Sequence, residues 1–178
     1  SFEAPRALLG AHDQSDRACD WQRAWADAQH ADADGWAAVH RSRAPLLDPL
    51  ACADVIREVE AHAAATGGWS TARHVEAPTT DVPVSEVVSI RGWFDEVLRT
   101  KLFPMLAERY PNVAPTAADL RVMDAFVVRY DAAAQASLPV HQDENALSFT
   151  IALNDASEYE GGGTCFEALR PAGGAEPY

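Results

Sequence analysis

The chain has 178 residues, of which 48% are hydrophobic, as is typical of a folded domain with a buried core. Its formal net charge of −13 argues against nucleic-acid phosphates and anionic membrane surfaces as partners, because both need clustered Lys and Arg. Its three cysteines, without a CxxC spacing, predict neither a disulfide framework nor a zinc ribbon. No apolar run approaches a membrane span and residues 1–10 do not resemble a signal peptide, so the compartment stays unassigned.

Residues 1–44 are predicted to form a helical extension of the domain. Trp21 and Trp25 are four residues apart and would share one face of a helix, and Trp36 follows. We expect this Trp-rich segment to pack on the body of the protein or on a protein partner.

Two long helices are predicted within residues 45–110. Asp48 followed by Pro49 is typical of a helix start, and a helix is expected over residues 50–65, ended by the glycines at 67 and 68. After an extended edge segment, a second helix is predicted over residues 85–109, kinked or broken by Pro104. The side chains that we expect these helices to bury against a sheet are Val55, Val59, Trp93 and Val97.

From residue 120 the hydrophobic period changes from 3.6 to 2, which predicts a β-rich core over residues 120–178. The predicted strands are residues 120–130, 137–143, 147–153 and 163–169, the last of them after a glycine hairpin at 161–163.

Two residues of the second predicted strand, His141 and Asp143, are candidate metal ligands. Alternate side chains of a strand project from the same face, so this imidazole and carboxylate would converge on one point. Such a pair supplies two of the three donors of the facial triad that holds non-haem Fe(II). A bare H-x-D is also common by chance, and the alternative is a strand that presents two polar residues to water.

Four blocks of the sequence occur in the order and spacing of a known family. They are VVRY at 127–130, SLPVHQD at 137–143, FTIALN at 149–154 and YEGGGTCF at 159–166. These blocks resemble the catalytic domain of the procollagen lysyl hydroxylases, members of the prolyl/lysyl hydroxylase group of 2-oxoglutarate- and Fe(II)-dependent dioxygenases. With weaker matches upstream, the resemblance covers residues 45–168.

The resemblance implies an α+β fold, in which N-terminal helices support a double-stranded β-helix, or jelly-roll, core. It implies an oxidoreductase that hydroxylates a peptidyl lysine, a peptidyl proline or a small molecule, with Fe(II), 2-oxoglutarate as co-substrate and ascorbate as reductant. His141 and Asp143 would bind the metal, and the Tyr130 hydroxyl would line the 2-oxoglutarate pocket. Thr150, on the strand face with small residues, would leave room for that ligand.

The sequence also departs from the family. The family completes its iron site with a second histidine after the hairpin, and an arginine or lysine beyond it binds 2-oxoglutarate, whereas no histidine follows His141 here. The sequence therefore predicts a jelly roll that is incomplete at its C-terminal end. Acting alone, such a chain should turn over 2-oxoglutarate very slowly or not at all. The competing interpretation is a non-catalytic, hydroxylase-fold structural subunit of a larger assembly.

Overall fold

The structure is a computed structural model that describes residues 39, 40, 42, 44–75 and 77–164. The described residues belong to two units. One comprises residues 42–129 and 152–154, and the other residues 39–40, 130–151 and 155–164. The predicted extension lies almost wholly outside the described residues, as does most of the predicted strand at 163–169. Within the part of the chain that the structure describes, no helix combines the length and hydrophobicity needed to cross a bilayer.

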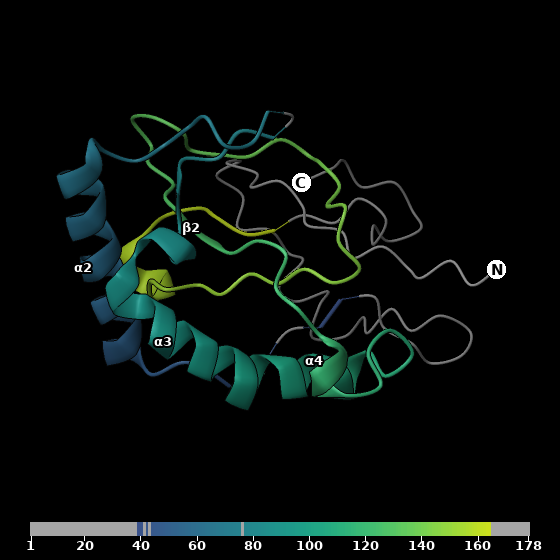
Figure 1. The fold of residues 1–178 in the computed structure, drawn as a ribbon. Helices are drawn as coiled ribbons and strands as arrows, with labels where there is room; N and C mark the ends of the chain where they lie inside the picture. The colour runs from purple at the N-terminus through teal and green to yellow at the C-terminus, as the bar shows by residue number, and fades with distance from the viewer. Residues whose placement is uncertain (1–38, 41, 43, 76, 165–178) are drawn as a thin grey trace. The chain divides into compact units, whose positions relative to one another are not determined.

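Helix α2 (Pro49–Thr66) confirms the first predicted helix (Figure 1). The Asp48 carboxylate accepts a hydrogen bond from the Leu50 N–H at 2.8 Å, which satisfies one of the free donors of the first turn. Gly67 ends the helix with φ at 99°, a left-handed conformation that glycine adopts without steric cost. One side of the helix is buried through Cys52, Val55, Val59 and Ala63.

The second predicted helix is present but consists of three consecutive segments, α3 (Val88–Val97), a π-helical turn (Leu98–Leu102) and α4 (Phe103–Arg109) (Figure 1). The predicted break at Pro104 is therefore observed as a widened turn instead of a simple kink. Proline has no N–H and its ring crowds the carbonyl four residues earlier. Pro104 then lies in the first turn of α4, the part of a helix that tolerates proline best.

The sheet consists of two short antiparallel strands, β1 (Asp81–Pro83) and β2 (Phe126–Val128). Val82 lies opposite Val127, and the neighbouring pairs project to the other face of the sheet. An isolated bridge between Ser70 and Asp81 extends the pairing on the second edge of β1. The strand predicted over residues 120–130 is thus real but only three residues long.

The strands predicted at 137–143 and 147–153 do not form ladders among the described residues. A strand is held by backbone hydrogen bonds to a neighbouring strand, and an alternating pattern of residues does not supply that neighbour. The alternation itself is present, because every second residue of 149–153 is partly buried and those between are exposed. The jelly-roll fold remains a prediction.

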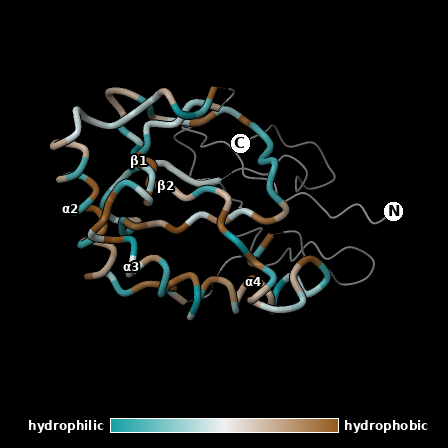
Figure 2. Tube along the Cα trace, in the orientation of Figure 1, coloured by the Kyte–Doolittle hydropathy of each residue, from teal (hydrophilic) through white to brown (hydrophobic). Residues whose placement is uncertain are grey.

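The hydrophobic core of the larger unit lies where α2, α3 and the sheet meet. Its buried members are Val55, Val59, Ala63, Val82, Val84, Val87 and Ile90. The predicted burial is confirmed for Val55 and Val59. Trp93 is only partly buried against this cluster, and Val97 is buried outside it. Hydrophobic and hydrophilic residues alternate along the trace of α3, as expected for a helix with one buried side (Figure 2).

On the opposite face of β1, the carboxylate of Asp81 is completely buried. Arg73 donates a hydrogen bond from Nη1 to its Oδ1 at 2.5 Å, and the Thr79 hydroxyl donates to its Oδ2. The other terminal nitrogen of Arg73 lies 2.9 Å from Oδ2 of Asp124. Burial alone would lower the pKa of Arg73, but its hydrogen bond to Asp81 and the charges of both carboxylates raise it above its ordinary value. This ionic network joins the loop after α2 to β1 and to the segment that precedes β2.

Replacing Asp81 by Asn should destabilise the protein by about 3 kcal/mol, because it breaks the ion pair between a completely buried carboxylate and the partly buried Arg73 guanidinium. The measurement is the free energy of unfolding from urea titrations. Asp54→Asn is the matched control, since Asp54 also pairs with an arginine at 2.5 Å but in an exposed position, where water screens the interaction. Equal effects of the two substitutions would contradict the importance assigned to the buried network.

Candidate metal-binding site

His141 and Asp143 lie together in the smaller unit, as the H-x-D spacing predicted. His141 Nε2 is 3.5 Å from Asp143 Oδ1, and the two side chains are only 20% and 19% exposed. The convergence is therefore confirmed, although an irregular segment positions the pair and not a strand ladder. Their assignment as metal ligands remains a prediction.

The local chain around the pair is restrained by Leu138 and Pro139. Leu138 is buried, while Val140 is exposed, so the segment is anchored on one side just before the histidine. Proline fixes its own φ and favours an extended conformation in the residue before it. The second ring nitrogen of the histidine, His141 Nδ1, lies 2.9 Å from the Pro139 carbonyl oxygen.

The distance between His141 and Asp143 fits two ligands of one metal ion. Metal–nitrogen and metal–oxygen bonds of about 2.0–2.2 Å place two donors about 3.0 Å apart at a right angle and about 3.5 Å apart at a tetrahedral angle. The observed 3.5 Å also exceeds the usual length of a hydrogen bond. An imidazole with a carboxylate is a donor set that suits Fe(II), Mn(II) and similar first-row ions.

Among the residues that the structure describes, a third protein donor is not found beside the pair. Within the described ranges no group of three or more His, Cys, Asp or Glu side chains is arranged to hold a metal. The residues present thus fit two positions of a metal site, with the remaining positions left to other donors.

Tyr130 and Thr150 belong to the same unit as the candidate ligands. Burial raises the pKa of the Tyr130 phenol, so its hydroxyl keeps its proton at neutral pH and can donate a hydrogen bond. Thr150 is exposed, with partly buried residues on either side of it. Their predicted role as contacts of 2-oxoglutarate remains a prediction.

His74 is not a metal ligand of the described site. Its ring packs against Phe126 with 4.7 Å between the ring centroids, and its Nε2 lies 3.5 Å from Asp81 Oδ2. The charged partners of the network were not found from sequence, because residues 73, 81 and 124 share no regular spacing.

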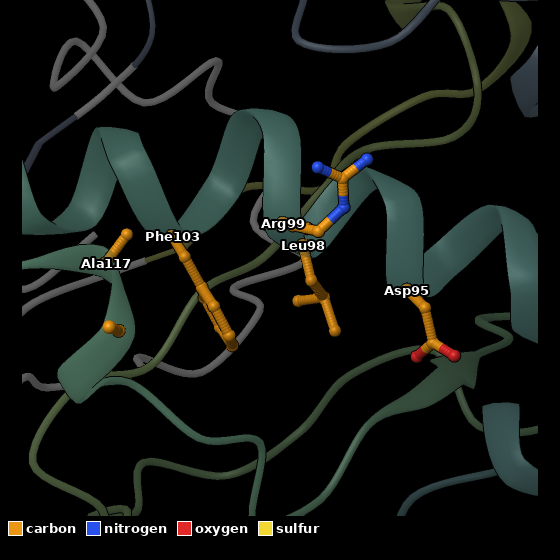
Figure 3. A pocket seen from close by; sticks show the side chains of 6 residues that line it. Asp95, Leu98, Arg99, Phe103 and Ala117 are labelled. Atoms are coloured by element: carbon orange, nitrogen blue, oxygen red, sulfur yellow. The ribbon is translucent and has the colours of Figure 1, made fainter.

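A separate pocket of about 400 Å³ lies in the larger unit, beside the π-helical turn. Its lining residues are Asp95, Leu98, Arg99, Phe103, Ala117 and Ala118. Leu98, Phe103 and Asp95 point to the same side, whereas Arg99 points away from them (Figure 3). The Arg99 guanidinium instead pairs with Glu96 at 2.5 Å.

Comparison with known proteins identifies relatives of this chain. No family model and no solved structure matches it. Procollagen-lysine,2-oxoglutarate 5-dioxygenase 1 from Gallus gallus is 31% identical over 133 residues, and that from Homo sapiens is 32% identical. Each alignment covers 68% of this chain. The chain is a homologue of the procollagen-lysine 2-oxoglutarate 5-dioxygenases.

The second human form of these enzymes is also similar, at 26% identity over 132 residues. The resemblance predicted from the four sequence blocks is thereby confirmed. The chain spans 17% of the length of the curated relatives that it matches.

The site predicts that Mn(II) binds to this chain through the H-x-D pair. Asp143→Asn should weaken binding at least about tenfold, because loss of even an indirect supporting contact weakens metal sites by about 10- to 100-fold. Glu144→Gln is the matched control, since it removes the same charge one residue away from an exposed side chain. Isothermal titration with MnCl2 measures both, and equal affinities of the two variants would exclude Asp143 as a ligand.

Proposed function

We propose that this chain contributes to an Fe(II)- and 2-oxoglutarate-dependent hydroxylase that acts on lysine side chains of peptides. The observation that carries the proposal is the 3.5 Å approach of His141 Nε2 and Asp143 Oδ1 in a chain homologous to procollagen-lysine dioxygenases. When bound, Fe(II) together with 2-oxoglutarate and O2 supplies the oxidising power that converts a C–H bond into an alcohol. Ascorbate would keep the iron reduced.

The charges of the two ligands suit the binding of an anionic co-substrate. His141 would bind the ion as a neutral imidazole, and Asp143 would contribute one negative charge. A divalent ion held by this pair therefore retains a net charge of about +1, which attracts a dicarboxylate. The Tyr130 hydroxyl, which stays protonated because burial raises its pKa, would donate a hydrogen bond to a carboxylate of 2-oxoglutarate. Thr150 would leave space beside it.

The net charge of the chain favours a basic peptide as substrate. At −13, the protein attracts cations over a distance of about one Debye length, near 8 Å at physiological ionic strength. A lysine ammonium gains from this attraction, whereas a proline ring does not. The curated relatives carry procollagen-lysine in their names, which supports the same choice.

A second candidate function is that of a non-catalytic, hydroxylase-fold subunit in a larger assembly. It is favoured by one observation, namely that the described residues provide two protein donors and no third. Under this alternative the H-x-D pair would stabilise the local chain, and removal of His141 would change folding but no reaction.

The proposal predicts succinate release from 2-oxoglutarate that depends on Fe(II) and on a lysine-containing collagen-like peptide. The assay uses this chain and the complete gene product that contains it, with ascorbate present. His141→Ala should reduce the rate of the complete product at least about a hundredfold, since a metal ligand is lost, and Glu144→Gln should leave it nearly unchanged.

Two outcomes would count against the proposal. If the complete gene product released no succinate with any of the peptides, the non-catalytic subunit would be favoured. Release that persists in His141→Ala would show that the reaction does not use this site.

A further inference from the structure

We propose that the carbonyl oxygen of Pro139 fixes the tautomer of His141, so that Nε2 presents its lone pair toward Asp143 before any metal is bound. Pro139 is then a positioning residue. The consequence for metal binding rests on the proposed function, whereas the tautomer is a property of the chain alone.

The two ring nitrogens of His141 have different surroundings, and these distinguish the tautomers. Nδ1 lies 2.9 Å from the Pro139 carbonyl oxygen, which can only accept a hydrogen bond. A neutral imidazole carries one N–H, so a proton on Nδ1 leaves a lone pair on Nε2. The opposite tautomer would bring two lone pairs together at 2.9 Å, and its Nε2–H would face Asp143 Oδ1 across a nitrogen–oxygen distance of 3.5 Å, which is too long for a good hydrogen bond.

The position of the acceptor is set by the chain just before the histidine. Leu138 is only 8% exposed and anchors the segment, and Pro139 has a fixed φ. Because the contact spans two residues, it forms without closing a long loop. Val140, the residue between Pro139 and His141, is 55% exposed, so its packing does not restrain the segment.

This arrangement places the proton of the histidine away from the metal position. A metal ligand needs a deprotonated nitrogen, and histidine ligands commonly donate their other N–H to a backbone carbonyl. Here the acceptor is provided within the same five-residue stretch, by a proline two positions before the ligand. The pair would therefore reach its metal-binding geometry with little rearrangement.

The first test is the tautomer itself, in metal-free protein at pH 8, above the ordinary titration range of histidine. Nitrogen NMR of protein labelled with 15N-histidine distinguishes protonated from unprotonated ring nitrogens, and His141→Ala identifies the signals. We expect a protonated Nδ1 and an unprotonated Nε2. A protonated Nε2, or an equal mixture, would overturn the proposal.

The second test weakens the acceptor without moving it. Replacing Val140 by its α-hydroxy acid turns the Pro139 carbonyl into an ester carbonyl, which is a poorer acceptor. We expect the fraction of the Nδ1–H tautomer to fall and the affinity for Mn(II) to drop about tenfold, the lower end of the effect of such supporting contacts. The same exchange at Ala146, in an exposed part of the loop, is the control.

Equal effects of the two ester exchanges would overturn the role of Pro139. Failure of the unmodified chain to bind Mn(II), with the Nδ1–H tautomer present, would count against the proposed function and leave the tautomer established.

Discussion

The buried carboxylate of Asp81 is the interaction on which the larger unit depends. A two-stranded sheet with three residues in each strand has too few ladder hydrogen bonds to be stable by itself. On one face of that sheet, Val82 and Val127 pack against the helices. On the other face, Asp81 pairs with Arg73 of the loop after α2. A buried charge is tolerated only when it is fully compensated, so the path of this loop is determined by the carboxylate that it must cover.

The candidate metal site follows the opposite electrostatic arrangement. At Asp81 a guanidinium compensates the carboxylate, whereas the neighbour of Asp143 at 3.5 Å is an imidazole. The first carboxylate is therefore neutralised within the fold, and the second lies beside a group that can itself bind a cation. This contrast, together with the homology, distinguishes the structural histidine and aspartate at 74 and 81 from the pair at 141 and 143.

Local signals in the sequence were sufficient for the helices, and they anticipated the approach of His141 and Asp143. Asp48 and Pro49 favour a helix start and Gly67 favours a helix end, so the bounds of α2 could be predicted almost to the residue. Pro104 indicated a break in the second helix, but not the π-helical form of that break at Leu98–Leu102. The spacing of His141 and Asp143 predicted their approach within a strand, whereas an irregular segment brings them together.

The sheet and the buried ionic network could not be predicted in the same way. A ladder depends on which strand lies alongside. The alternation over residues 149–153 indicates which side chains are buried, but it does not indicate which strand would pair with this segment. Arg73 meets Asp124 across 51 residues of sequence, so no local pattern signals the pair. The Pro139 carbonyl is a backbone group, present in every sequence, and only its distance from His141 reveals its role.

The central claim is that His141 is a metal ligand, and pulsed electron paramagnetic resonance of bound Mn(II) tests it most directly. In protein labelled with 15N-histidine, a directly coordinated imidazole couples its nitrogen spin to the metal electrons. The account predicts a 15N coupling in the unaltered chain that disappears in His141→Ala. Bound Mn(II) without such a coupling, or a coupling that survives the substitution, would contradict it.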